Sequence, residues 1–255
     1  MRTHLLITSA ALALLATGCG DVNSSSGQLG RLNYSLHSDF LVDGAALVGT
    51  SILTGHPQTI RVELTDSGED DTSNPEDIEH RAVPSEGVTV ETWESSSDVG
   101  SMTITVTTPG DYVIESVLDG NVFDWLTLTF DSPTSMELVT WIRPPNGEDF
   151  DQTNGSPIFT DEGAQAAFVP IPLDAGGDRI AGDFVPVITA DPEWAVVTGV
   201  NVLGIYEQNV VVARSPASVY FIEPGEISVT VTDDVNGVDG VAVFDVAPVN
   251  VPVGR

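Results

Sequence analysis

Carboxylates are the most abundant chemistry-bearing side chains of this chain: Asp and Glu number 38 against 8 Arg, and there is no Lys. They are densest between positions 66 and 77, where the four candidate metal ligands are Asp66, Glu69, Asp70 and Asp71. Calcium takes six to eight oxygen ligands, which such a loop could supply. The spacing does not fit an EF-hand, because Pro75 and Glu76 occupy the wrong places and the required glycine is missing. An exposed acidic loop between two strands explains the same composition, so we expect no cofactor, with calcium as the alternative.

A second acidic run extends from Asp233 to Gly240. It contains Asn236-Gly237, a strong signal for a tight hairpin turn. Turn chemistry already explains these residues, so we predict a hairpin here rather than a metal site.

No arrangement of side chains predicts catalysis. After position 18 the histidines are His37, His56 and His80, which lack the paired spacing of a zinc site. No G-x-S-x-G motif occurs, and among so many carboxylates any glycosidase-like pair could be nominated. We therefore predict a non-enzyme without catalytic residues; a secreted hydrolase with an unrecognised site is the last alternative.

The net charge of −30 limits the partners of the chain. An acidic surface repels nucleic acid and anionic lipid headgroups, so no nucleic-acid partner is expected. The same charge fits solubility in salty surroundings or cation binding, and surface solvation is the simpler explanation.

The only cysteine, Cys19, ends a run that has the layout of an export signal: Arg2, an apolar stretch and then small residues. The stretch from Leu5 to Ala16 is too short to span a bilayer. Ala16-Thr17-Gly18-Cys19 resembles the lipobox of bacterial lipoproteins, although Ala16 stands where that family most often has Leu. The resemblance implies cleavage of residues 1–18, lipidation of Cys19 and a membrane-anchored protein of the cell envelope. An ordinary cleaved signal followed by a free cysteine is the alternative.

The residues after the cysteine add two expectations. In Gram-negative lipoproteins an Asp directly after the cysteine favours the inner membrane; Gly20 stands there, so the resemblance favours the outer membrane if the cell has one. The polar stretch from Asp21 to Gln28 has the composition of a flexible tether. We assign 19–30 to the lipidated cysteine and this tether.

Alternating residues predict an all-β protein. Strands are expected at 59–65, 101–107, 126–130 and 227–232, where Thr alternates with apolar residues, and no sustained helical repeat occurs after the signal. An internal repeat divides the chain: Pro109-Gly110-Asp111-Tyr112 recurs as Pro224-Gly225-Glu226-Ile227, and each copy continues into a hairpin and a closing strand. We place the domains at 31–143 and 161–255, with 144–160 as a linker containing a strong turn signal.

Units of this size with about seven short strands suggest immunoglobulin-like sandwiches. The terminal strand, hairpin and closing strand of each copy resemble bacterial Ig-like and PKD-like repeats, which implies two tandem β-sandwiches held together without disulfides. A tyrosine corner is possible only in the first copy, since Ile227 replaces Tyr112 in the second.

These features favour a non-enzymatic spacer or adhesion and interaction module on the bacterial cell surface, with a protein or glycan partner that the sequence does not identify. A carbohydrate-binding module is the first alternative. Trp125 is the candidate contact residue, because it lies on the face of its strand opposite Leu126, Leu128 and Phe130 and is expected to project outward. Aromatic residues within strands are more often structural, which is the competing interpretation.

Overall fold

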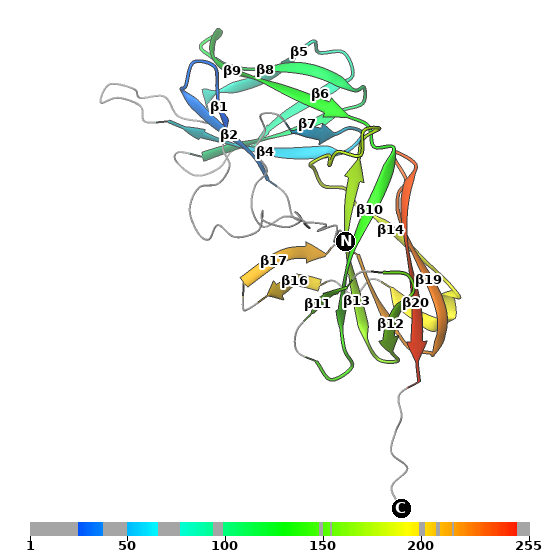
Figure 1. Cartoon of the computed structure of the whole chain (residues 1–255). Helices are drawn as coiled ribbons and strands as arrows, with labels where there is room; N and C mark the ends of the chain where they lie inside the picture. The colour runs from blue at the N-terminus through cyan, green and yellow to red at the C-terminus, as the bar shows by residue number, and fades with distance from the viewer. Residues whose placement is uncertain are drawn as a thin grey trace, which may run out of the picture.

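The protein folds into two β-sandwiches (Figure 1). The computed structural model describes residues 25–37, 50–65, 77–93, 99–147, 150–153, 155–198, 202–207, 210–215 and 217–248. Apart from short 3-10 turns such as η2 (Glu193–Ala195), the described elements are strands, which confirms the all-β prediction. Within these ranges no helix has the length and apolar character needed to cross a membrane.

The first sandwich consists of two sheets. One has the order β1-β2-β4-β7-β6 and contains β1 (Ser25–Ser26), β2 (Leu32–His37), β4 (Pro57–Leu64), β7 (Val99–Val106) and β6 (Val88–Trp93). The other has the order β3-β9-β8-β5 and contains β3 (Ser51–Leu53), β9 (Asn121–Asp131), β8 (Gly110–Leu118) and β5 (Glu79–Val83). Neighbouring strands are antiparallel except β3 and β9, which are parallel.

The second sandwich repeats this plan. Its first sheet has the order β11-β10-β13-β18-β15 and contains β11 (Asp151–Thr153), β10 (Ser135–Arg143), β13 (Gln165–Leu173), β18 (Ala217–Phe221) and β15 (Val196–Thr198). Its second sheet has the order β12-β20-β19-β14 and contains β12 (Ile158–Asp161), β20 (Val238–Ala247), β19 (Gly225–Asp233) and β14 (Val187–Asp191). Again one pair, β12 and β20, is parallel. A separate hairpin of β16 (Val202–Glu207) and β17 (Val210–Ser215) is inserted between β15 and β18.

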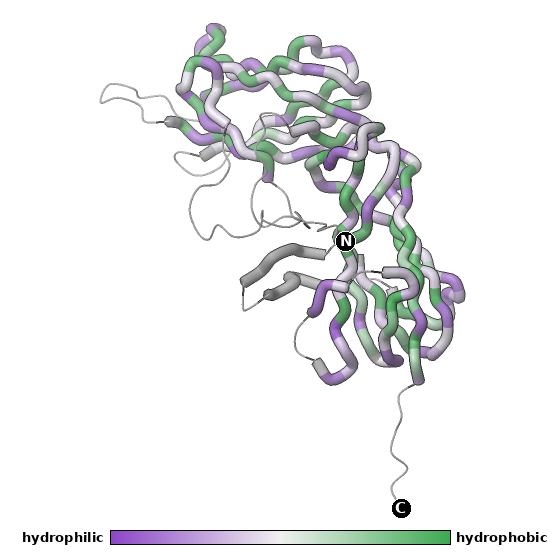
Figure 2. The backbone as a smooth tube through the Cα atoms, viewed as in Figure 1, coloured by the Kyte–Doolittle hydropathy of each residue, from purple (hydrophilic) through white to green (hydrophobic). Residues whose placement is uncertain are grey.

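Each sandwich is filled by the inward-facing residues of alternating strands. In β4, Ile60 and Val62 are buried while Arg61 between them is exposed, and β19 buries Ile227, Val229 and Val231 in the same way. Two main clusters of buried side chains result, one inside each sandwich. Hydrophobic and hydrophilic residues alternate along the strands in Figure 2.

The strand order is that of an immunoglobulin-like sandwich. In each copy the strands equivalent to A, B, E and D form one sheet, and those equivalent to G, F and C form the other. The first copy, the only one in which the sequence allows it, also has a tyrosine corner: the Tyr112 hydroxyl donates a hydrogen bond to the Thr108 carbonyl oxygen at 2.8 Å. The internal repeat read from the sequence therefore corresponds to two copies of one topology.

The boundary between the sandwiches differs from the sequence prediction. β10 pairs with β13 along its whole length, so it belongs to the second sandwich, although the prediction placed 31–143 in the first. The chain crosses between the sandwiches at 132–134, and the stretch 144–160 contains β11 and β12 instead of a linker. Its Pro- and Gly-containing segment is a turn within the second sandwich: Gly147 N donates to the Pro144 carbonyl oxygen.

Candidate functional site

Most of the residues that the sequence nominated for chemistry lie outside the described part of the chain. These are Cys19 and the calcium candidates Asp66, Glu69, Asp70 and Asp71. Within the described ranges no group of three or more His, Cys, Asp or Glu side chains is arranged to hold a metal ion. The second acidic run forms the predicted hairpin turn between β19 and β20.

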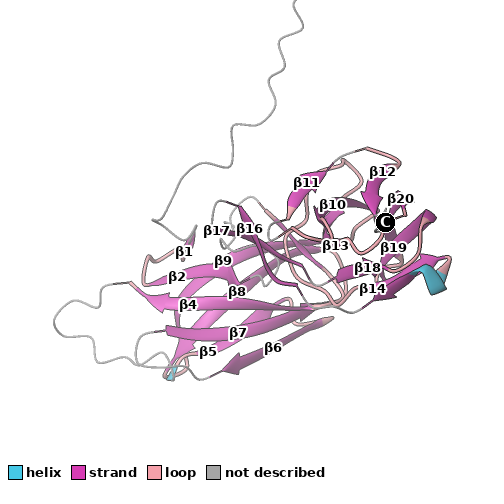
Figure 3. Ribbon diagram, turned by 90° about the horizontal axis from the view of Figure 1, so that it is seen from below, coloured by secondary structure: helices cyan, strands magenta, loops and turns pink. Residues whose placement is uncertain are grey.

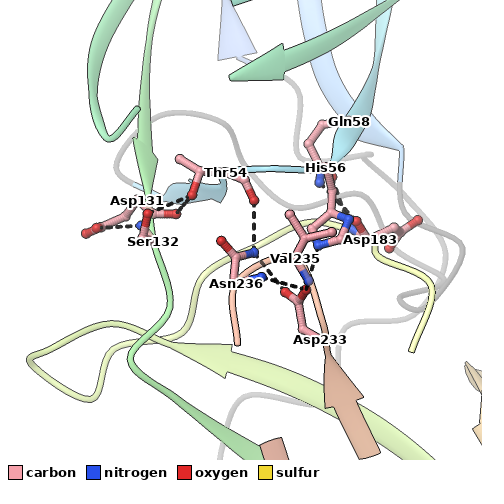
Figure 4. Close-up of polar contacts among 9 residues, drawn as sticks. All are labelled: Thr54, His56, Gln58, Asp131, Ser132, Asp183, Asp233, Val235 and Asn236. Atoms are coloured by element: carbon pink, nitrogen blue, oxygen red, sulfur yellow. Dashed lines mark hydrogen bonds and ion pairs between the residues drawn. The ribbon is translucent and has the colours of Figure 1, made fainter. Parts of the chain in front are cut away.

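That hairpin turn has an additional role, because it docks onto the first sandwich (Figure 4). Asp233 is fully buried, and its Oδ1 lies 2.8 Å from Nε2 of His56, which precedes β4. The same oxygen accepts the backbone N–H groups of Val235 and Asn236, at 3.1 and 3.2 Å. The Asn236 side-chain amide donates both to Asp233 Oδ2 and, across the junction, to the Thr54 carbonyl oxygen. A turn that the sequence explains locally thus also joins two domains.

A second set of contacts crosses the junction beside the first. The Gln58 side chain donates to the Asp183 carbonyl oxygen at 3.0 Å and accepts the Asp183 N–H at 2.9 Å. Ala181 exchanges backbone hydrogen bonds with β3, accepting from Leu53 N and donating to the Ser51 carbonyl oxygen. Because both partners of each contact are satisfied, burying these polar groups does not leave an unpaired donor or acceptor.

Apolar side chains also cross the junction. Leu53 of the first sandwich is part of the second core, and Ala181 of the second sandwich is part of the first core. The His56 ring lies 5.7 Å from the Phe184 ring, centroid to centroid. The backbones approach closely here: a Cβ on Gly55, whose φ is +81°, would come within 2.8 Å of Val235 Cγ1. The junction is therefore packed as well as hydrogen-bonded.

A buried carboxylate also fixes the start of the first sandwich. Asp124 of β9 is inaccessible to solvent and accepts four backbone N–H groups, those of Leu29, Arg31, Leu32 and Trp125, at 2.8 to 3.0 Å. Its carboxylate fills the space where a Cβ on Gly27 would lie. These backbone donors satisfy the acceptor oxygens of the buried carboxylate.

The contacts of Asp124 change the extent of the predicted tether. Ser25 and Ser26 form β1, and Gln28 N donates to the Trp125 carbonyl oxygen. The stretch from 25 onward is therefore part of the sandwich, and only 19–24 of the predicted tether lie outside the described residues.

The structure brings together one serine and histidine that could resemble a nucleophile and its base. Ser116 Oγ lies 2.9 Å from His80 Nδ1 and 2.8 Å from the Tyr34 hydroxyl. Ser116 is fully buried, so a substrate could not reach its hydroxyl. Burial lowers the pKa of His80 to about 4 and raises that of Tyr34, so both side chains are neutral near pH 7. Ser116 and Tyr34 are buried and His80 is partly buried, so the three groups form a polar network at the margin of the core.

The tryptophans occupy different environments. Trp125, the predicted contact residue, is half-buried on β9 opposite Glu115 of β8. Trp141 is buried under Phe150 and Val169 on the outer face of its sheet. Trp194 in η2 has 67% of its surface exposed, and sequence reasoning did not single it out. An isolated tryptophan next to a turn gives no periodic signal from which exposure could be inferred.

Comparisons with known proteins add no family. No protein-family model and no curated protein matches the sequence. Among solved structures, the Escherichia coli adhesin FdeC matches with a TM-score of 0.31 and 17% identity over 88% of this chain and 65% of that one. The bacterial integrin-binding protein invasin matches with a TM-score of 0.31 and 16% identity over 88% and 41%, and domains 5-6 of the S-layer protein SbsC match with 0.31 and 15% over 86% and 100%. The fold assignment rests on the strand order and the tyrosine corner described above.

Proposed function

We propose that this chain is a non-enzymatic, lipid-anchored protein of a bacterial cell envelope, in which two immunoglobulin-like sandwiches act as a stiff spacer or adhesion module. The observation that carries the proposal is the junction, where His56 and Thr54 bind the Asp233–Asn236 turn and Leu53 enters the neighbouring core. Domains joined by a flexible linker move relative to each other by default, whereas these are held by hydrogen bonds and shared packing. A spacer needs this property, because it must hold its far end at a defined distance from the membrane.

The anchor part of the proposal is supported by the sequence before residue 25. An apolar segment that ends at the only cysteine provides a single lipidation site, and more than one acyl chain gives stable membrane attachment. We expect the wild-type protein to fractionate with membranes and to carry a lipid at Cys19, detected by mass spectrometry of the N-terminal peptide. The Cys19→Ala variant should be released into the soluble fraction. Membrane association that survives this substitution would refute the anchor.

The stiffness of the spacer can be tested at Asp233. The Asp233→Ala variant loses the hydrogen bonds to His56 and to its own turn, so the two sandwiches should separate into a range of orientations. Small-angle X-ray scattering of the chain from residue 20 onward should then show a larger maximum dimension than the wild type. Asp234→Ala is the matched control, because this neighbouring side chain is exposed. Identical scattering from Asp233→Ala and wild type would mean that the Gln58–Asp183 and Ala181–β3 contacts hold the junction without Asp233. Wild-type scattering that fits only a range of domain orientations would count against the stiff-spacer role.

A further inference from the structure

The second sandwich has an open edge between its two sheets. β14 is the last strand of its sheet and pairs with β19 on one side; on its other side no described strand is hydrogen-bonded to it. β15 is the last strand of the opposite sheet. Between these two edges lies a groove of ≈550 Å³, next to the short helical turn coloured cyan beside β14 in Figure 3. Ligand sites in proteins commonly have volumes in this range.

The first sandwich serves as an internal comparison for this edge. Its strand equivalent to β15 is β6, which is six residues long, whereas β15 has only three. Its strand equivalent to β14 is β5, which buries Ala82, whereas every residue of β14 is partly or fully exposed. Both copies end in an edge strand at this position, β5 in the first and β14 in the second. The shorter β15 and the greater exposure of β14 are what set the second copy apart.

The groove has an apolar floor and a polar rim. Ile188, Ala190 and Val196 line it, and all three belong to or pack against the core of the sandwich. The rim contains the exposed Trp194, the carboxylate of Glu193 and the hydroxyl groups of Thr189 and Thr198. None of the described residues that line the groove is cationic. An exposed aromatic residue beside an aliphatic floor is typical of a protein contact site.

An extended peptide fits this geometry better than a glycan. The free edge of β14 can form main-chain hydrogen bonds with an added strand, and alternate side chains of that strand would point into the groove. In other immunoglobulin-like sandwiches a further strand is added at this same position, beside strand C. A sugar on the aliphatic floor would lose hydrogen bonds to water that only the rim groups of Glu193, Thr189 and Thr198 could replace, whereas an added strand also gains the main-chain bonds of β14.

The charge of the groove selects among peptides. Asp191 ends β14, Glu193 lies two residues later, and the chain as a whole has a net charge of −30. A segment flanked by basic residues would be attracted to this edge, while a second copy of the same acidic chain would be repelled. We propose that the β14–β15 groove binds an extended segment of a partner protein, with apolar residues at alternate positions and basic residues at its ends. This proposal deepens the interaction role proposed above, and its failure would leave the membrane anchor and the stiff spacer untouched.

The test uses synthetic peptides and the chain from residue 20 onward, which contains every described residue. The probe is acetyl-Arg-Val-Thr-Val-Thr-Val-Arg-amide; its controls are the same residues in a non-alternating order and a version with Glu in place of both Arg. Amide and indole chemical shifts in NMR titrations report where and how tightly each peptide binds. We expect the alternating basic peptide to shift the β14 amides and the Trp194 indole, at least tenfold more tightly than either control.

Variants distinguish binding of the peptide in this groove from non-specific binding elsewhere on the surface. Trp194→Ala should weaken binding of the basic peptide at least tenfold, and Ala190→Arg, which fills and charges the groove, should abolish it. Phe159→Ala is the matched control, because Phe159 is 75% exposed on β12 at the opposite edge of the same sheet, and binding should be unchanged. The proposal would be overturned if all three peptides bound equally or if none shifted the β14 amides. It would also be overturned if cellohexaose shifted these amides and the basic peptide did not. Concentration-dependent shifts of β14 in the protein alone would overturn it in favour of a second copy.

Discussion

Burial of His80 predicts a specific loss of stability in mild acid. Its imidazole bonds Ser116 inside the first sandwich, and burial lowers its pKa from 6.5 to about 4. The unfolded state therefore takes up a proton at His80 at a higher pH than the folded state. The stabilisation is complete above pH 6.5 and is lost as the pH falls toward 4.

The size of this loss follows from the two pKa values. At pH 5 the unfolded chain gains about 2 kcal/mol relative to the folded one from this single group, and at pH 4 about 3 kcal/mol. A loss of about 3 kcal/mol is a large part of the free energy of unfolding of a typical domain, which is roughly 5–15 kcal/mol. A difference between the wild type and a variant at position 80 isolates the contribution of His80 from that of the other titratable groups.

The experiment compares chemical denaturation of the wild type and His80→Gln at pH 7, 6, 5 and 4. Glutamine can still hydrogen-bond Ser116 but does not titrate, so the wild type should lose about 3 kcal/mol more than the variant between pH 7 and pH 4. Ile114→Val is the control for simple destabilisation: it removes a methylene group from a fully buried position and should cost about 1 kcal/mol equally at every pH. Parallel curves for wild type and His80→Gln would refute the reasoning.

Two further substitutions test the hydrogen bonds that shape the first sandwich. Asp124→Ala should lower the free energy of unfolding by about 3 kcal/mol or more, because four backbone N–H groups lose their acceptor. Its control is Glu91→Ala, which removes an exposed carboxylate from β6; a loss of only about 0.5 kcal/mol for Asp124→Ala, as at an ordinary surface site, would contradict the role of Asp124. Tyr112→Phe should lower the free energy of unfolding by about 1 kcal/mol in thermal and chemical unfolding, since it removes only the hydrogen bond to the Thr108 carbonyl oxygen. A loss of several kcal/mol would contradict this assignment of a single hydrogen bond to the hydroxyl.

Local patterns predicted the parts of this fold that depend on local physics. Alternation located β4, β7, β9 and β19, and Asn236-Gly237 located the last hairpin. The recurrence of Pro-Gly followed by an acidic residue identified two copies of one topology. Each of these signals acts over a few residues, because strand pleat and turn geometry are set by neighbours in the chain.

The domain boundary was missed because a turn signal does not say where the chain goes next. Pro144 and Gly147 mark a true turn, but it returns the chain to the sheet that it has just left. β10 has the same alternating pattern whichever sandwich it joins, so its assignment depends on pairing with β13, some thirty residues away. The sequence offers no local indication of that partner.

The two buried carboxylates were missed for a related reason, and they show how this chain uses its excess of acid. Asp124 and Asp233 are not in the densest acidic run. Their long-range hydrogen bonds, such as those of Asp124 to Leu32 N and of Asp233 to the His56 ring, join residues 92 and 177 positions apart. With 8 Arg and no Lys, ion pairs are scarce, and the Arg–carboxylate pairs that the structure records lie at exposed positions.

Backbone N–H groups bond to both buried carboxylates. Four of them bond to Asp124, and two bond to Asp233 together with the Asn236 amide and the His56 ring. At Asp124 the recorded hydrogen bonds all come from the backbone, so no opposing ion has to be desolvated to make them. Asp124 holds the chain where it enters the first sandwich, and Asp233 holds the second sandwich against the first. In a chain with a net charge of −30, the two acidic residues that organise the molecule therefore face backbone donors, and neither belongs to the densest acidic run of the sequence.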